Sequence, residues 1–356
     1  MKSLKEMDGD LINHWYVLAL ESEVKDKPLR RTVYDTPYVI FRDETKKIRV
    51  FEDRCIHRGT QLSMGKCEKG GIRCPYHGWR FHSDGTIAEI PSNGDLVPPK
   101  DWRLKAPPQQ IQDGCVWIWP GSEEPKLPPP WRFPFHSESE WSQYFMITDF
   151  KNEVTNLVQN FMDVPHTVFV HDKWFRRRRQ ICVPISLFAS DGKLKVTYRQ
   201  QKDEIGFTSK LLNRKKKPMI HTDEFIFPNI TRVDYVFGDH QFIINSQCTP
   251  ISRYQTRVYT WICFRVGWLT PWLKPFLKFY TRQVIQQDVD IMKNQGTNLE
   301  IFEREEGPQS FNAKGGYYSS SADELHLVID RMRSQGAKDK TQINSYSLSR
   351  EGELWI

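Results

Sequence analysis

Two short cysteine–histidine pairs constrain this chain more than any other feature of its sequence. Cys55 and His57 are separated by one residue, and after sixteen further residues Cys74 and His77 are separated by two. Thiolate sulfur and neutral imidazole nitrogen are both good ligands for transition metals. Each pair is accompanied by residues that suit a tight loop with close backbone approach, namely Gly59, Pro75 and Gly78. The pattern predicts two metal-binding loops that share one centre.

Two kinds of metal centre use such a ligand set. In a Rieske [2Fe-2S] cluster, two thiolates bind one iron and two neutral imidazoles bind the other. A structural zinc site would instead gather all four ligands around one ion. The Cys-x-His order differs from the usual order of zinc fingers, and the flanking Arg58-Gly59 and Gly78-Trp79-Arg80-Phe81 resemble the Rieske family. We therefore expect the two pairs to hold a Rieske cluster.

A second group of candidate ligands lies at residues 160–171, which read Asn-Phe-Met-Asp-Val-Pro-His-Thr-Val-Phe-Val-His. Asn160, Asp163 and His166 follow one another at steps of three, which in a helix places them along one face. His171 comes five residues after His166 and would point about 140° away from it in a regular helix. If both imidazoles bind one ion, the turn between them must loosen or bulge.

A carboxylate from elsewhere in the chain would complete the 2-His-1-carboxylate triad of non-haem Fe(II), which leaves positions open for dioxygen. We choose Asp288, because it lies in a late helical segment that is expected to close over the sheet of the second domain. Asp290 is the competing candidate.

The chain resembles the alpha subunits of Rieske non-haem iron oxygenases over nearly its whole length. It is most similar to the short monooxygenase and demethylase branch of that family. The family pattern Asn-x2-Asp-x2-His-x4-His matches residues 160–171, and the late acid of the family corresponds to Asp288. The usual Glu-Asp pair is replaced here by Gln287-Asp288, which changes a neighbour of the candidate ligand and not the ligand.

The resemblance implies a division of roles among these residues. His166, His171 and Asp288 would bind the mononuclear iron, with Asn160 and Asp163 as further residues of the catalytic site. Asp163 would also form a bridge to His77 of a neighbouring subunit in a head-to-tail homotrimer.

The implied activity is that of an oxidoreductase that uses dioxygen to hydroxylate a small molecule. If the carbon attacked carries an ether or an amine, the product collapses and the net reaction is demethylation. Electrons would come from NAD(P)H through a separate reductase or ferredoxin, because the sequence has neither a Gly-x-Gly-x-x-Gly fingerprint nor the cysteines of a plant-type ferredoxin.

Two alternative functions remain open from the sequence. The alternatives are an electron-transfer Rieske protein without oxygenase activity and a zinc-stabilised binding module.

The order of patterns along the chain predicts an α+β protein. Short alternating strands indicate an all-β Rieske domain over residues 1–125, and a proline-rich stretch indicates a linker over residues 126–150. Strand patterns between residues 183 and 266, flanked by helical segments, predict a START-like helix-grip catalytic domain with an antiparallel sheet over residues 151–310. Residues 311–356 are expected to form a C-terminal tail with one short helix.

Composition and charge limit the binding partners and the cellular compartment that we expect. The net charge of +7 comes partly from two basic runs, at residues 176–179 and 214–217. No recognition motif accompanies these runs, so we expect a solvated surface or a patch for an acidic electron donor and no nucleic acid. The late apolar stripe is interrupted by charges, which argues against a membrane partner. The sequence shows no apolar secretory segment and no regular disulfide spacing, so we expect a cytoplasmic protein with reduced thiols.

Aromatic side chains are frequent in the strands of the expected second domain. They are compatible with a pocket for a cyclic, mostly apolar substrate, and core packing accounts for them equally well. The residues concerned are Phe225, Phe227, Tyr235, Phe237, Trp261 and Phe264.

Overall fold

The computed structural model describes residues 4–94, 96–125, 129, 132–133, 135, 138–171, 181–199, 213, 217–267, 270–306 and 318–356. The chain divides into two compact units. One unit comprises Ile12–Arg132, and the other comprises Met1–Leu11 together with Phe133–Ile356. The first eleven residues, which we expected in the Rieske domain, therefore group with the later part of the chain. Their attachment is direct, because Asp8 forms an ion pair with Arg333, at 3.9 Å between Oδ2 and Nη2.

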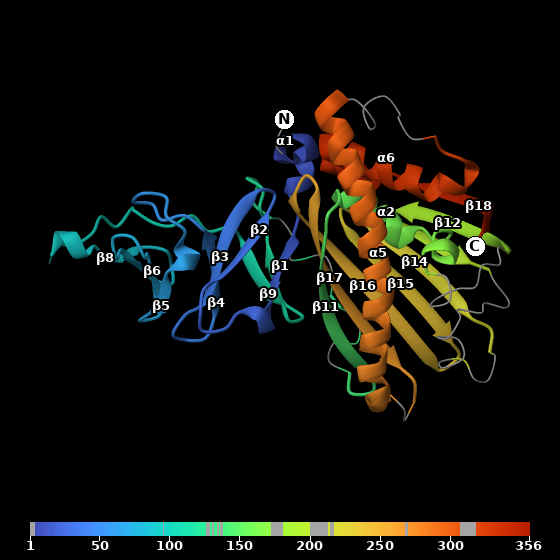
Figure 1. Cartoon of the computed structure of the whole chain (residues 1–356), viewed down its shortest axis with the longest axis horizontal. Coiled ribbons are helices and arrows are strands. Elements are labelled where there is room, and N and C mark those ends of the chain that lie inside the picture. The colour runs from blue at the N-terminus through green and yellow to red at the C-terminus, as the bar shows by residue number, and fades with distance from the viewer. Residues whose placement is uncertain are drawn as a thin grey trace. The chain divides into compact units, whose positions relative to one another are not determined.

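The unit Ile12–Arg132 is built from short antiparallel strands in three sheets, as the alternating pattern predicted (Figure 1). The sheet orders are β1-β10-β9, β2-β3-β4 and β5-β6-β7-β8. The strands are β1 (Tyr16–Leu20), β2 (Leu29–Val33), β3 (Thr36–Arg42), β4 (Ile48–Glu52), β5 (Lys66–Glu68), β6 (Gly71–Arg73), β7 (Arg80–Phe81), β8 (Ile87–Glu89), β9 (Gln109–Gln112) and β10 (Cys115–Ile118). One candidate ligand loop follows β4, and the other joins β6 to β7.

The second unit is organised on one eight-stranded antiparallel sheet in the order β11-β17-β16-β15-β14-β13-β12-β18. Its strands are β11 (Ser142–Phe150), β12 (Cys182–Ser190), β13 (Lys193–Tyr198), β14 (Ile220–Ile226), β15 (Ile230–Phe237), β16 (His240–Ser252), β17 (Gln255–Arg265) and β18 (Leu348–Trp355). The expected α+β class with an antiparallel catalytic sheet is confirmed.

Two of these strands correct the expected boundaries. The second half of the expected linker, residues 142–150, is the edge strand β11, which pairs with β17 along its whole length. The expected tail supplies β18, which pairs with β12 at the other edge. Edge strands have only one partner and carry a weaker alternating pattern, so the sequence alone did not separate them from loops.

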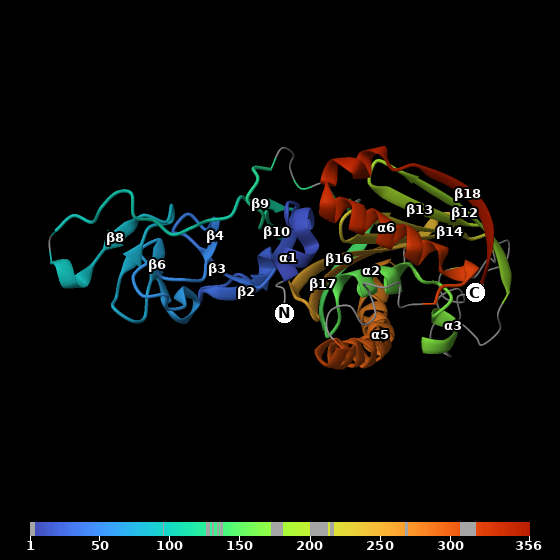
Figure 2. The ribbon, with the colours of Figure 1, turned by 90° about the horizontal axis from the view of Figure 1, so that it is seen from above.

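The described α-helices of this unit are α1 (Leu4–Asp8), α2 (Val154–Met162), α3 (Thr167–Val170), α5 (Thr270–Glu306) and α6 (Glu324–Lys338). Figures 1 and 2 show the long helix α5 lying across one face of the sheet. α2 packs against β14, β15 and β16, and α6 packs against α2. The apolar core between them includes Leu157 and Val158 of α2 and Ile329 of α6, none of which is measurably exposed. Among the described helices, none is long and apolar enough to cross a membrane.

Candidate metal centres

The two loops of the first unit have the same backbone construction. The amide of Cys55 donates to the carbonyl of Thr60 at 2.8 Å, and the amide of Cys74 donates to the carbonyl of Trp79, also at 2.8 Å. Each loop closes through a glycine with positive φ, Gly59 at +76° and Gly78 at +74°. A residue with a Cβ is strained in that conformation, which accounts for the glycine in both loops.

The four side chains on these loops are arranged as two like pairs. The thiols of Cys55 and Cys74 are buried and neighbour one another, and neither forms a disulfide. The rings of His57 and His77 lie edge to face with centroids 4.6 Å apart. Trp79 stacks on His57, with centroids 4.6 Å apart and planes inclined by 5°, and so fixes the plane of that imidazole.

The electrostatics of these groups suit metal ligation. Burial and the neighbouring Cys74 raise the pKa of Cys55 to about 11, so in the metal-free protein the thiol keeps its proton until a metal displaces it. Burial, His77 and Arg58 lower the pKa of His57, which favours the neutral imidazole that binds metal. The Nδ1 atom of His57 is buried and has no hydrogen-bond partner in the described structure. A buried ring nitrogen without a partner is expected where a metal is to bind.

A two-iron cluster and a single ion place their ligand atoms at different spacings. The atoms around one tetrahedral zinc ion lie within about 4 Å of one another, because zinc–ligand bonds are about 2.0–2.3 Å long. Among the described residues, the one His/Cys/Asp/Glu group whose ligand atoms all lie within 4.8 Å of each other is His166, His171 and Asp288. The paired arrangement of the loops, with the two thiols together and the two imidazoles together, fits the ligand set of a two-iron cluster.

The His-x4-His segment is shaped by a helix end. We expected Asn160, Asp163 and His166 to follow one another along a helix, but α2 ends at Met162 and Asp163 has extended backbone angles. Pro165 accounts for the break, because proline lacks an amide donor and disfavours helical angles at the residue before it. The short helix α3 then begins at Thr167, and His171 follows its end. This break, and not a bulge within one helix, turns both imidazoles the same way.

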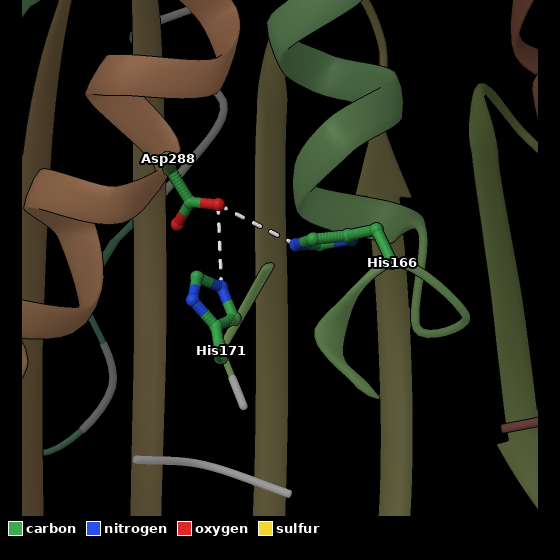
Figure 3. A group of neighbouring side chains, drawn as sticks. All are labelled: His166, His171 and Asp288. Carbon is green, nitrogen blue, oxygen red and sulfur yellow. Dashed lines mark ion pairs between the residues drawn. The ribbon is translucent and has the colours of Figure 1, made fainter. Parts of the chain in front are cut away.

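His166, His171 and Asp288 meet around one carboxylate oxygen (Figure 3). Oδ1 of Asp288 lies 3.4 Å from Nε2 of His166 and 3.2 Å from Nε2 of His171. Nδ2 of Asn160 donates to the same oxygen at 3.3 Å. Asp288 and His171 are 6% and 3% exposed, so this group is shielded from bulk water.

Hydrogen bonds at the far side of each imidazole fix which nitrogen faces the carboxylate. Nδ1 of His166 donates to the backbone carbonyl of Asp163, and Nδ1 of His171 donates to Oε1 of Gln287 at 3.0 Å. With the proton held on Nδ1, each Nε2 has its lone pair directed toward the shared centre, as in metal-binding histidines. Nε2 of His166 is buried and has no hydrogen-bond partner among the described groups.

In the metal-free chain, the carboxylate and the imidazoles of this group shift each other's pKa values. Burial alone would lower the pKa of His166, but the Asp288 carboxylate outweighs burial and raises it. Burial alone would raise the pKa of Asp288, but the two imidazoles outweigh it and hold the pKa below its usual range. A divalent cation would bind at Nε2 of the two imidazoles and at the carboxylate of Asp288. The donor set of two imidazoles and one carboxylate fits the non-haem Fe(II) triad.

A cavity of about 140 Å³ adjoins this group within the same unit. Helix α5 contributes one stripe to its wall, with residues at helical steps of three and four: Leu277, Tyr280, Thr281, Val284, Ile285 and Asp288. Strands β14 to β17 contribute the opposite wall, and the lining of the cavity as a whole is mostly apolar. The position of the group at the cavity wall means that a molecule in the cavity would lie beside the candidate metal.

Three residues that the sequence analysis discussed lie outside the group of candidate iron ligands. Asp290 is exposed and accepts a hydrogen bond from Gln286 at 3.0 Å, so it does not join the group. Asp163 lies at the cavity wall, partly exposed, with its Oδ2 4.0 Å from Nε2 of His326. Sequence reasoning noted Gln287 as a departure from the family pattern and missed its bond to His171.

Two further expectations concern surfaces and the pocket. Of the six aromatic residues considered for the pocket, Tyr235 is the one that lines the cavity among those described, and the others are buried away from it. The basic run at residues 176–179 lies outside the described residues, as does all of the run at 214–217 except Lys217.

Residues 14–104 match the model of the Rieske [2Fe-2S] domain. The chain is 33% identical over 184 residues to chlorophyllide a oxygenase of Chlamydomonas reinhardtii, covering 50% of this chain and 27% of that protein. It is also 33% identical over 180 residues to the oxygenase component of dicamba O-demethylase of Stenotrophomonas maltophilia, covering 48% of this chain and 52% of that protein. The chain thus spans about half or less of the length of these relatives.

Solved structures extend the likeness to the second unit. Dicamba monooxygenase bound to 3,6-dichlorosalicylic acid superposes with a TM-score of 0.79 at 20% identity, covering 93% of this chain and 98% of that one. NdmA of Pseudomonas putida CBB5 with caffeine superposes with a TM-score of 0.74 at 16% identity, covering 96% and 95%. Residues 14–104 therefore form a Rieske [2Fe-2S] domain, and the chain as a whole shares its fold with the solved structures of dicamba monooxygenase and NdmA.

Proposed function

We propose that this chain is the oxygenase component of a Rieske non-haem iron system. In this proposal it takes electrons from a separate reductase or ferredoxin and uses dioxygen to hydroxylate or oxidatively demethylate a cyclic, mostly apolar small molecule. The observation that carries the proposal is the meeting of His166, His171 and Asp288 at the wall of an apolar cavity, in a chain that also holds the Rieske ligand set.

The geometry of the two centres supports the proposed ligand roles. Cys55, Cys74, His57 and His77 would hold the [2Fe-2S] cluster, and His166, His171 and Asp288 would hold one Fe(II). When bound, the cluster supplies single electrons and the mononuclear iron supplies activation of dioxygen.

The protein residues around the second centre would control its surroundings. The backbone carbonyl of Asp163 and the side chain of Gln287 hold the two imidazoles in the tautomer that directs Nε2 inward. Asn160 donates to Asp288 and so orients the carboxylate. The apolar wall limits the water beside the substrate, which protects a reactive centre from side reactions.

The proposed assembly is a head-to-tail homotrimer in which Asp163 contacts His77 of the next subunit. His77 is exposed at the tip of its loop, and Asp163 is partly exposed, so both are accessible to another chain. The proposed compartment is the cytoplasm, which is supported by seven cysteines that all remain free thiols.

Metal analysis and spectra of the purified protein test this function against its alternatives. The oxygenase should contain about three irons and two sulfides per chain and show a Rieske electron paramagnetic resonance (EPR) signal after reduction. A Rieske electron-transfer protein should contain only the two cluster irons and should give no oxygen-dependent product in single-turnover experiments with reduced protein. A zinc module should be colourless. Either of the last two results would refute the proposal.

A further inference from the structure

One charged side chain of the cavity wall comes from the sheet. Asp223 lies on β14, opposite Val233 of β15, which in turn lies opposite Ile244 of β16. All three side chains line the cavity, so Asp223 belongs to a row that faces the interior. The other two acids of the described wall, Asp163 and Asp288, come from the helical side. Asp223 is only 1% exposed.

The carboxylate of Asp223 is held by hydrogen bonds from two side chains. Oδ1 accepts a hydrogen bond from Nε2 of His221 at 3.0 Å, and Oδ2 accepts one from the hydroxyl of Tyr198 at 2.9 Å. The imidazole of His221 lies between two aromatic rings, with ring centroids 4.3 Å from Tyr198 and 4.5 Å from Tyr235. These contacts fix the carboxylate in position.

The two contacts leave hydrogen-bonding capacity on the Asp223 side chain. A carboxylate offers about four acceptor sites, and the described side-chain donors to Asp223 are His221 and Tyr198. A donor on a molecule in the cavity could therefore bond the same carboxylate, and a charged donor such as an ammonium group forms the strongest bond of this kind.

We propose that Asp223 is the residue that anchors the substrate, and that the cavity takes a single-ring molecule carrying an amine or another strong hydrogen-bond donor. This inference rests on the proposed function and adds the class of substrate. A single ring is proposed because the described cavity of about 140 Å³ is close in volume to the ~150 Å³ that holds one benzene ring. The aromatic walls Tyr235 and Phe242 add favourable contacts for an ammonium group.

Binding of four related probes to the iron-loaded full-length chain, without reductant, tests the inference by calorimetry. The probes are 4-methoxybenzylamine, 4-methoxybenzyl alcohol, 4-methoxytoluene and 4-methoxybenzoate, which share one ring and differ in charge and in donors. We expect the amine to bind most tightly and the benzoate most weakly. The Asp223→Asn variant should lose roughly ten- to hundredfold in affinity for the amine and change little toward the toluene, because it removes a charge-assisted hydrogen bond.

The matched control is Asp234→Asn, an acid of the neighbouring strand β15 that pairs with Arg232 and does not line the cavity. It should keep the wild-type preference for the amine. The inference is wrong if the benzoate binds the wild type as tightly as the amine, if no probe binds, or if Asp223→Asn keeps its affinity for the amine. The wild-type ranking needs no variant and decides the matter if Asp223→Asn does not fold. Amine binding that is lost in Asp223→Asn, together with no oxygen-dependent product in separate single-turnover experiments with reduced protein, would count against the proposed function and support the anchor.

Discussion

The hydrogen bond between Gln287 and His171 leads to a specific prediction about iron affinity. Replacing Gln287 by methionine keeps a similar side-chain volume and removes the acceptor for Nδ1–H of His171. A neutral hydrogen bond contributes about 1 kcal/mol, or about fivefold in affinity. His171 is 3% exposed, so water does not readily replace the lost acceptor, and loss of such partners costs roughly 10- to 100-fold in metal affinity. We expect about a tenfold weaker affinity for Fe(II).

The assay is competition between the mononuclear site and a ferrous chelator, with the Rieske EPR signal as an internal standard for the cluster. Gln287→Glu should bind iron at least as tightly as the wild type, because a carboxylate is a stronger acceptor. The matched control is Gln286→Met, since Gln286 is exposed and bonds Asp290. Wild-type affinity in Gln287→Met, or equal losses in Gln287→Met and Gln286→Met, would refute the tautomer argument.

Three other changes test the two centres and their connection. Asp288→Ala should lose the mononuclear iron and all product while the Rieske colour remains, and Asp290→Ala should do neither; iron analysis that shows the reverse would transfer the ligand role to Asp290. Cys55→Ser should abolish the Rieske EPR signal and turnover, because an alkoxide is a poor cluster ligand, and a full signal would contradict the cluster assignment. Co-expressed Cys55→Ser and His166→Ala chains should recover about a quarter of wild-type turnover if electrons cross between subunits of a head-to-tail trimer, because a site works only in a Cys55→Ser chain whose donor neighbour is a His166→Ala chain. Mixed trimers without activity would exclude that route.

The candidate ligands could be identified from the sequence because ligand chemistry demands particular residues at short spacings. Two Cys-His pairs with glycine and proline in their loops suit few sites besides a metal centre, and the structure gives those glycines the positive φ that suits such tight loops. The α+β class also followed from sequence, since alternation over several strands is a local property of the chain.

Other features depended on contacts between residues far apart in sequence. The choice of Asp288 over Asp290 rests on which face of α5 meets α2 and α3, and Asp288 lies 128 residues from Asn160, whose side chain bonds it. The edge strands β11 and β18 formed because the sheet offered them partners, and their own patterns were too weak to indicate this. His221 and Asp223, which no sequence pattern singled out, became a buried polar site when the register of β14 turned both into the buried face. Local chemistry therefore determined which residues can bind metal, and tertiary packing decided which of them meet, because only the folded chain removes water from a charge and brings distant groups within bonding distance.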